Sequence, residues 1–306
     1  MTKLTCLDCK YSTTRLVAPE EPALHRDSED MFETKFFLLE GEGRQGVGGL
    51  RTQGYFKQSQ PNKPVISVVT VVFNGEKFLE DTIQSVINQT YDNVEYIIID
   101  GGSTDGTLDI IKKYVNQIDY WVSEKDEGIY DAWNKAVSVL SGVWVSFLGA
   151  DDTYKPTALS LYADMIAVSP EINYISSRVD LMKSGKRVRV VGEAFSAVSF
   201  KKRMNVAHVG SLHKRELFLK TGLFNLNYKV VSDYEFFVRN LSKIRAGFIN
   251  ESCANMQVGG VSDGSTLVFQ EVAKVKLKYG LRTKYSAWLE KNYSIFKWLL
   301  RKKIWY

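Results

Sequence analysis

Residues 65–73 read VISVVTVVF, a run of β-branched residues that ends at Asn74 and Gly75. Such a run predicts a strand buried on both faces. Residues 94–99 (VEYIII) and 143–148 (VWVSFL) repeat the pattern, and 118–122 predict a shorter strand. Apolar residues at helical spacing lie between these strands, over 78–87, 108–114 and 129–140. Buried strands joined by short helical crossovers predict an α/β fold with a doubly wound, mainly parallel sheet flanked by helices.

Polar residues follow three of these strands. Asn74 comes after the first strand, Asp100 after the second, and Asp151 with Asp152 after the fourth. In doubly wound sheets, ligands bind at the carboxyl ends of the strands, so these side chains predict a site.

Two adjacent carboxylates are costly to place together without a cation. Mn²⁺ or Mg²⁺ prefers oxygen ligands and commonly binds one or two carboxylates together with substrate phosphates. Asp151 and Asp152 are therefore our candidate metal ligands. The alternative is that Asp152 or Thr153 caps the helix expected after Pro156.

The segment Asp100–Gly106 (DGGSTDG) fits neither the dinucleotide-binding fingerprint nor the phosphate-binding P-loop. Its glycines allow a ligand to approach the backbone closely. Asp100 could accept hydrogen bonds from a base or a ribose. The alternative is a tight strand-to-helix turn capped by Ser103 or Asp105.

Charge and composition exclude several classes. Residues 271–306 carry ten Lys or Arg and two Glu, a net charge of +8, so the other residues sum to −3 within the total of +5. A basic tail on an acidic body argues against nucleic-acid binding and favours contact with an acidic surface. No apolar run is long enough to span a membrane, and no signal peptide is evident. We therefore expect a cytoplasmic protein, with the inner face of the cytoplasmic membrane as a further location.

The cysteines predict no disulfide framework. Cys6, Cys9 and Cys253 are an odd, low number, which fits a reducing compartment. Cys6 and Cys9 form a C-x-x-C pair, but no second pair or histidines at ligand spacing follow, so we interpret them as thiols of an N-terminal segment.

We predict three parts. Residues 1–63 form a flexible N-terminal extension, in which the glycine-rich run 41–49 holds neither helix nor strand. Residues 64–265 form the main domain, with a nucleotide-binding half (64–155) and an acceptor-binding half (156–265). Residues 266–306 form a basic helical tail rich in aromatics, which either lies in a membrane interface or packs on the body. Within the second half we expect a helix to residue 168, a hairpin over 172–191, helices over 214–222 and 233–241, and an extended segment over 246–258.

Three runs of sequence resemble a known family. The runs ISVVTVVFNGEKFLEDTIQSVINQTYDNVEYIIIDGGSTDGTLDIIKKY, SEKDEGIYDAWNKA and SFLGADD, in this order and spacing, resemble the nucleotide-binding half of family 2 glycosyltransferases of the GT-A fold. The bacterial members that build surface polysaccharides are the most similar. The resemblance implies that Asp100 and its neighbours bind the donor, that Asp151 and Asp152 bind metal and diphosphate, and that Asp126 and Asn134 lie near the donor. Two departures, Gly101 where many members have Asp and Ala136 where many have Gly, affect the base contacts rather than the class.

The second half resembles the family more loosely. HVGSLHKREL (208–217), followed by GLF (222–224), is similar to a family region, and VSDYEFF (231–237) lies where the family places its catalytic base. The resemblance implies that Asp233 is this base, and that Gly260 and Ser262 lie near the donor diphosphate. It places His208 near the acceptor or the diphosphate, although a core histidine is the alternative. For Asp233 the alternative is a helix N-cap.

Together these features predict a metal-dependent, inverting hexosyltransferase. It would transfer a sugar from a nucleotide-sugar donor, UDP-sugar favoured, to a hydroxyl of a glycan or lipid-linked acceptor in surface polysaccharide synthesis. One carboxylate base without a covalent nucleophile implies a single displacement. The alternatives are a non-catalytic nucleotide-sugar-binding or assembly subunit and a sugar-1-phosphate nucleotidyltransferase, although the latter's Gly-rich, basic first loop is missing at 74–77.

Overall fold

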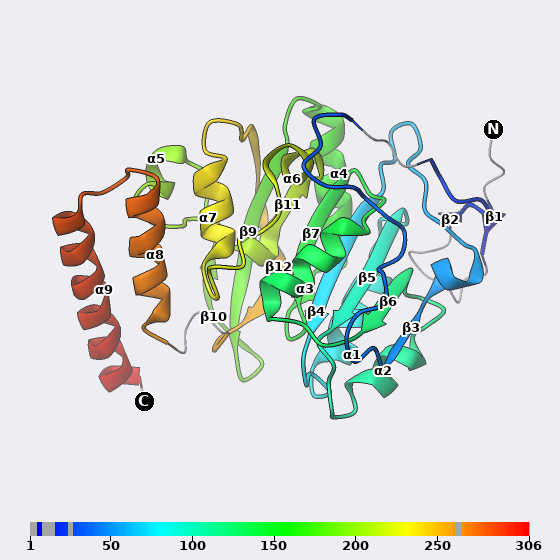
Figure 1. Cartoon of the computed structure of the whole chain (residues 1–306), viewed down its shortest axis with the longest axis horizontal. Helices are drawn as coiled ribbons and strands as arrows, with labels where there is room; N and C mark the ends of the chain where they lie inside the picture. Colours follow the sequence, from blue (N-terminus) through cyan, green and yellow to red (C-terminus); the bar gives the residue numbers. More distant parts are fainter. Residues whose placement is uncertain (1–4, 8–15, 24–26, 261–264, 306) are drawn as a thin grey trace.

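The computed structural model describes residues 5–7, 16–23, 27–260 and 265–305, without the side chains of Cys6 and 301–305. Its main feature is a ten-stranded sheet whose path runs β3-β6-β5-β4-β7-β11-β9-β12-β8, with β10 paired to β9 (Figure 1). The strands of this sheet are β3 (Gly46–Gly48), β4 (Ile66–Val72), β5 (Val94–Asp100), β6 (Tyr120–Ser123), β7 (Trp144–Gly149), β8 (Thr153–Tyr154), β9 (Tyr174–Lys183), β10 (Lys186–Val191), β11 (Ser211–Lys214) and β12 (Ala246–Gln257).

The remaining elements are mostly helices. The short strands β1 (Thr5–Cys6) and β2 (Leu16–Val17) pair with each other. The helices are α1 (Leu79–Ile87), α2 (Thr107–Lys113), α3 (Ile129–Ser138), α4 (Ala158–Val168), α5 (Ala197–Phe200), α6 (Glu216–Thr221), α7 (Ser232–Arg239), α8 (Leu267–Lys278) and α9 (Lys284–Trp305), with 3₁₀ turns η2 (Leu50–Gln53) and η3 (His208–Gly210).

The parallel core of the sheet is the predicted one. The strands β6, β5, β4 and β7 are neighbours in this order and pair in parallel. Every residue of β4, from Ile66 to Val72, is paired with a residue of β5 without a register shift. All four strands are buried almost throughout, as their unbroken apolar runs require. The α/β class with a mainly parallel sheet is therefore confirmed.

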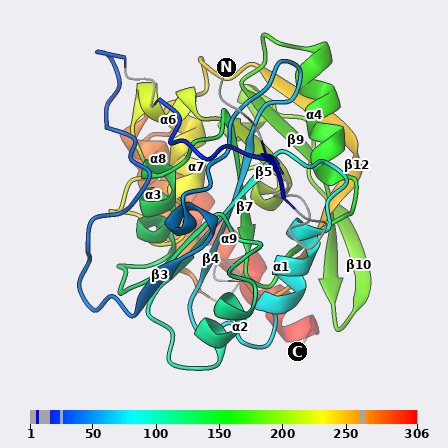
Figure 2. The same ribbon diagram turned by 90° about the vertical axis from the view of Figure 1, so that its right-hand side faces the viewer.

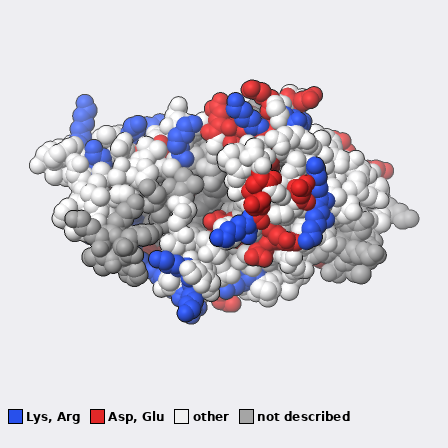
Figure 3. Space-filling model, turned by 90° about the horizontal axis from the view of Figure 1, so that it is seen from below, with Lys and Arg blue, Asp and Glu red and all other residues white. Residues whose placement is uncertain are grey.

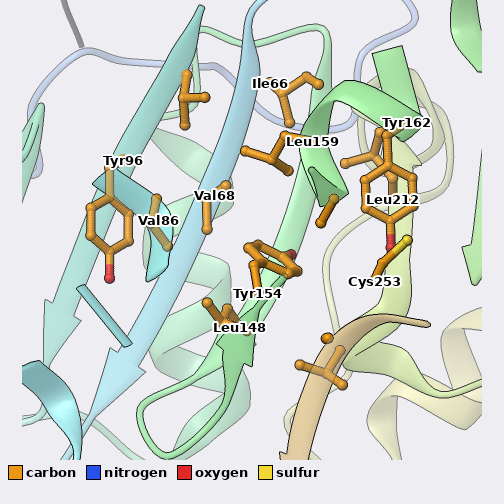
Figure 4. Packing of buried hydrophobic residues seen from close by; sticks show 14 of the residues in the cluster. Ile66, Val68, Val86, Tyr96, Leu148, Tyr154, Leu159, Tyr162, Leu212 and Cys253 are labelled. Carbon is orange, nitrogen blue, oxygen red and sulfur yellow. The ribbon is translucent and has the colours of Figure 1, made fainter. Parts of the chain in front are cut away.

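Helices cover both faces of this sheet. On one face, Ile66 and Val68 pack with side chains of α1 and α4, among them Val86, Leu159 and Tyr162 (Figure 4). On the other face, Val69 and Val71 pack with α3, α6 and α7. Successive residues of β4 thus serve opposite layers. Beyond the sheet, α8 packs on α7, and α9 is the outermost helix (Figure 1).

The N-terminal part differs from expectation. The glycine-rich run was expected to hold no strand, but Gly46–Gly48 forms β3, which pairs antiparallel with β6. The reason is the indole of Trp121: it lies so close that a Cβ on Gly46 or Gly48 would meet it at 2.9 and 2.7 Å. Only glycine lets this backbone pair beside that ring.

A buried arginine ties the same part of the chain to the sheet. Arg51 pairs with Glu95 of β5, and its Nη1 donates to the carbonyl oxygens of Phe36 (2.9 Å) and Val139 (2.8 Å). Burial alone would raise the pKa of Glu95, but Arg51 and the hydroxyls of Ser141 and Ser67 hold it below the ordinary value. Residues 36–57 are therefore part of the folded body.

The second half also shows where sequence patterns were insufficient. The hairpin is confirmed as β9 and β10, and the extended segment as β12. The helix expected over 214–222 begins only at Glu216, because Ser211–Lys214 forms β11 between β7 and β9. This four-residue strand contains His213 and Lys214 and lacks a β-branched run. No helix in the described part of the chain is long and apolar enough to cross a membrane.

Candidate active site

A cavity of about 500 Å³ opens where β4, β6 and β7 end. Its lining includes Asn74, Asp126 and Asp151, so three of the predicted residues share one cavity. The helices α1 and α2, which follow β4 and β5, lie on the same side of the molecule. Figure 3 views the molecule from this side, where Asp and Glu side chains gather among Lys and Arg.

The two adjacent aspartates converge at the end of β7. A Cβ built on Gly149 would lie 2.7 Å from Asp152 Oδ2 and 3.2 Å from Asp151 Oδ1. Among the described residues, neither carboxylate pairs with a Lys, Arg or His side chain. The alternative role as a helix cap is wrong, since α4 begins after Thr157 without a side-chain cap.

Two other elements hold this turn in place. The N–H of Gln257, the last residue of β12, donates to Asp152 Oδ1 at 3.0 Å. The Thr82 hydroxyl of α1 donates to the carbonyl oxygens of Ala150 (2.9 Å) and Asp152 (2.8 Å). Burial, and then the charge of Asp151, raise the pKa of Asp152 to about 7, although the N–H of Gln257 opposes the shift. Two carboxylates are therefore held close together in a state that a cation would stabilise.

The arrangement fits a divalent metal in part. Oxygen ligands on one side of an open cavity are what Mg²⁺ or Mn²⁺ uses when substrate phosphates complete its coordination. Within the described ranges, no group of three or more His, Cys, Asp or Glu side chains could hold a metal alone. A metal here would therefore need a further ligand, such as the phosphates of a substrate.

Asp100 does not line the cavity. It is fully buried, and its carboxylate accepts hydrogen bonds from the N–H of Ser103 (3.1 Å) and from the hydroxyls of Ser103 and Ser123 (2.5 Å for Ser123). The Ser103 hydroxyl also accepts from the N–H of Asn74 at 2.7 Å. Asp100 thus organises the loop after β5 in the manner of the alternative interpretation, a tight turn.

Asn74 connects the loops that follow β4 and β5. It adopts a positive φ of 52°, which asparagine tolerates better than most residues. Its Oδ1 accepts from the N–H of Thr104 at 2.9 Å. Asn74 therefore shapes the cavity wall through its backbone position.

The Asp126 carboxylate lies close to Gly101. A Cβ on Gly101 would meet Asp126 Oδ2 at 2.6 Å, so the carboxylate occupies the space that a side chain at position 101 would need. Its Oδ1 accepts from the N–H of Gly128 at 2.8 Å. Burial, followed by the charges of Asp131 and Asp100, raises the pKa of Asp126. Oδ2 has no hydrogen-bond donor within the described ranges, and the residue lines the cavity.

Arg44 and Gln45, from the N-terminal part of the chain, support the loop that carries Asp126. Arg44 donates to Glu124 through Nε (2.8 Å) and Nη2 (2.6 Å), and the N–H of Gln45 donates to the carbonyl oxygen of Ser123 at 2.8 Å. The Lys135 ammonium group also pairs with Glu124 at 2.9 Å. The loop that carries Asp126 is therefore fixed on both sides.

Asp233 lies in the first turn of α7. The Tyr130 hydroxyl donates to Asp233 Oδ1 at 3.0 Å. Tyr130 directly follows Gly128 and Ile129, which line the cavity. Asp233 is not the N-cap of α7, since Val231 holds that position. Its Oδ2 has no donor in the described part of the chain.

His208 lies between rings. It stacks on Trp133 (4.9 Å between ring centroids) and Phe147 (5.4 Å), and its Nε2 is buried without a hydrogen-bond partner among the described residues. Burial lowers its pKa, although Asp233 nearby opposes the shift. A neutral imidazole therefore lies near Asp233, between the core and the site.

Two further predicted residues, Asn134 and Gly260, do not line the cavity. Asn134 exchanges two hydrogen bonds with the backbone of Phe224, both 2.9 Å, and so braces the loop before α7 rather than lining the cavity. Gly260 follows β12 three residues after Gln257, the residue that contacts Asp152. Ser262 lies outside the described residues, as does Cys9 of the C-x-x-C pair.

Sequence reasoning missed Tyr130, Thr82 and the N–H of Gln257. Tyr130 lies inside a motif quoted above, and its position at a helix start was the available signal. The Thr82 hydroxyl donates to the backbone carbonyl oxygen of Asp152, 70 residues away in the sequence. The N–H of Gln257 donates to the Asp152 carboxylate, 105 residues away. No local pattern reports such contacts.

Comparisons with known proteins identify the family and the fold. Residues 67–215 match the model of glycosyl transferase family 2. A PGL/p-HBAD biosynthesis glycosyltransferase of Mycobacterium bovis is 31% identical over 183 residues, covering 58% of this chain and 70% of that protein.

Two solved structures share the fold. S. aureus TarS 1–349 in complex with UDP-GlcNAc has a TM-score of 0.59 at 18% identity, covering 72% of this chain and 67% of that one. The chain spans 38% of the longer TarS structure. The mannosyltransferase PcManGT from Pyrobaculum calidifontis, in complex with GDP-Man and Mn²⁺, has a TM-score of 0.57 at 18% identity, covering 77% and 70%. The fold is thus that of GT-A glycosyltransferases, and the chain belongs to glycosyl transferase family 2.

Proposed function

We propose that this glycosyltransferase transfers a hexose, with inversion, from a nucleotide-sugar donor to a hydroxyl of a glycan or lipid-linked acceptor in surface polysaccharide synthesis. The donor is a UDP-sugar, and a divalent metal, Mn²⁺ or Mg²⁺, is required. Residues 64–155 bind the donor and 156–265 the acceptor. The basic tail, residues 266–306, brings the enzyme into peripheral contact with a membrane.

One observation carries the proposal. Asp151 and Asp152 converge at the end of β7 without a cationic partner among the described residues, beside a cavity of about 500 Å³. A divalent metal would supply the missing positive charge, and the phosphates of a nucleoside diphosphate would supply its remaining ligands. A purely structural pair would be expected to contact a Lys or Arg side chain.

A nucleotide would bind in the cavity between Asp126 on one side and Asp151 with Asp152 on the other, and we assign different roles to these two sides. Asp126, at the β6 side, presents Oδ2 as an acceptor for a donor group of the base or the ribose. Asp151 and Asp152, at the β7 side, would hold the metal, which would neutralise the charge of the leaving diphosphate. Asn74 and Gly75 also line the cavity.

Asp233 is suited to remove the proton of the acceptor. A hydroxyl is a poor nucleophile at neutral pH, and a carboxylate within hydrogen-bond reach takes its proton as the new bond forms. Tyr130 orients Asp233 through Oδ1 and leaves Oδ2 for the acceptor. A single displacement by the deprotonated hydroxyl, on the face away from the departing diphosphate, would invert the configuration at the anomeric carbon.

The ligands of similar solved structures support the donor and the metal. UDP-GlcNAc is bound in the TarS structure, and GDP-Man with Mn²⁺ in the PcManGT structure. The mycobacterial relative is named for the biosynthesis of PGL and p-HBAD. We favour UDP over GDP because UDP or a UDP-sugar is bound in the TarS structure and also in that of the glucosyl-3-phosphoglycerate synthase from Mycobacterium tuberculosis.

Calorimetric titration tests the proposal. The purified protein is titrated with UDP-, GDP- and dTDP-sugars, each with Mn²⁺ and with a chelator. We expect one nucleotide class to bind, and chelation to weaken binding strongly. The absence of binding to any nucleotide sugar would contradict the proposal and favour a structural or assembly role.

A further inference from the structure

The last helix, α9, uses only one face to join the protein. Ala287 is buried against α8, and Trp298 contacts Phe269 of α8 at 6.4 Å between ring centroids. Glu290 pairs with Lys276 of α8 and, at 2.8 Å, with Arg282. Residues 287, 290 and 298 recur at helical spacing, so they define a single inner face.

The opposite face of α9 is mainly apolar, with Asn292 as a polar residue within it, and it is exposed. Its large side chains lie within about 140° of the helix circumference at 100° per residue. We call them the outer stripe: Tyr285 (72% exposed), Trp288 (57%), Leu289 (45%), Tyr293 (59%), Phe296 (59%), Leu299 (50%) and Leu300 (45%). A helix exposed on this scale marks an interaction surface, since soluble proteins rarely gather so many large apolar groups on one face.

Cationic side chains border this stripe. On the helical wheel, Lys284 lies on one side of it and Lys297 on the other, and both are exposed. Glu290 is the only acidic residue in the sequence of α9, and it faces inward to Lys276 and Arg282. The outer stripe is therefore flanked by positive charge without compensating negative charge of its own helix.

Charge decides between the two plausible occupants of such a surface. Pairing with α9 of a second copy would bring Lys284 and Lys297 near their counterparts, with no carboxylate on either outer face to offset the repulsion. An anionic lipid surface instead offers phosphates to the lysines. Tyr and Trp prefer the headgroup level, where an apolar ring and a polar atom are both accommodated.

We infer that the outer stripe of α9 lies in the interface of an anionic membrane, parallel to its surface. The helix is of the interfacial kind, with aromatic and Leu side chains on the lipid side and lysines at the borders. This inference specifies which surface makes the membrane contact of the proposed function, and it rests on that proposed function. The C-terminal end of α9 lies on the same side of the molecule as α1 and α2, the side of the candidate active site (Figures 1 and 2).

Vesicle flotation of the full chain tests the inference. The probes are phosphatidylcholine vesicles with and without phosphatidylglycerol. We expect binding to the anionic vesicles that weakens with added salt. Trp288→Ser and Phe296→Ser should each weaken binding by about tenfold or more, because each removes one inserted ring. Lys284→Glu with Lys297→Glu should abolish the preference for anionic lipid.

The control is Val168→Ser with Val198→Ser, which removes exposed apolar residues elsewhere (76% and 68% exposed) and should leave binding unchanged. Nucleotide titration of every variant reports on the transferase site separately. Lost flotation with unchanged nucleotide binding supports the inference. Three results would overturn it: a wild-type chain that does not float, ring variants that float like wild type, or a wild-type dimer that these variants dissociate.

Discussion

The contact between Gly101 and Asp126 gives a sharp prediction about donor recognition. Asp126 Oδ1 is engaged by the N–H of Gly128, whereas Oδ2 has no donor in the described part of the chain and lies 2.6 Å from the position of a Cβ on Gly101. Asp126→Ala removes the acceptor from the cavity. A hydrogen bond to a charged group contributes about 1.5–3 kcal/mol. We therefore expect the affinity for UDP with Mn²⁺ to fall by about ten- to 150-fold.

Gly101→Ala provides the companion test, because it removes no polar group. Its new methyl group would displace the Asp126 carboxylate, which is the end of a flexible side chain, so the protein should still fold. We expect weaker UDP binding in the wild-type background and almost no further effect when Asp126 is already Ala. Calorimetric titration of the four proteins measures this cycle.

The matched control is Glu127→Ala, the exposed neighbour of Asp126, which should leave UDP affinity unchanged. If Asp126→Ala binds UDP like the wild type, Asp126 does not contact the nucleotide. If the effects of Gly101→Ala and Asp126→Ala simply add, the close approach of these two residues is irrelevant to binding.

Three further predictions concern the base, the metal and the fold. Asp233→Asn should lower kcat by about 10²–10⁴-fold with unchanged donor affinity, since it removes a general base; product formation and calorimetry check this, and unchanged turnover would reject Asp233. Because the pKa of Asp152 is raised to about 7, its carboxyl group is protonated below that pH and must lose its proton to bind a metal. Mn²⁺ affinity should thus rise with pH up to about 7 and then level off, as titrations between about pH 5 and pH 8 would show; a flat profile would contradict it. Arg51→Met leaves Glu95 buried and unpaired and should cost about 3–5 kcal/mol of unfolding free energy. Denaturant titration measures this against Lys63→Met, an exposed pair expected to change stability by less than about 1 kcal/mol.

The parallel core could be predicted because its information is local. Each of β4, β5 and β7 is a buried run whose side chains serve both helical layers, so the apolar pattern itself marks the strand. The carboxyl ends of such strands meet at one edge, which is why Asn74 and Asp151 could be expected to line one cavity, whereas Asp126 was expected there only from the family resemblance.

The strands β3 and β11 could not be predicted in the same way. β3 consists of Gly-Val-Gly and is stabilised by the nearby Trp121 ring and by pairing with β6, more than 70 residues away. β11 contains His213, a fully buried histidine whose ring nitrogens have no hydrogen-bond partner among the described residues and whose pKa burial lowers strongly. Tertiary packing, rather than local propensity, selects the strand in both cases.

The site residues were likewise only partly predictable from sequence. Residues at a strand end could be located from sequence, but the direction of a side chain could not. Asp100 turns into the protein and accepts from Ser103 and Ser123, and Asn134 binds the backbone of Phe224. Both roles depend on partners that only the folded chain brings within reach.

The most direct test of the central claim is a crystal structure with UDP and Mn²⁺, with anomalous scattering recorded at the manganese edge. The account predicts one manganese peak within coordination distance of a carboxylate oxygen of Asp151 or Asp152, bridged to the diphosphate, with the base on the side of Asp126. A nucleotide bound without a manganese peak, or a peak away from both aspartates, would contradict it.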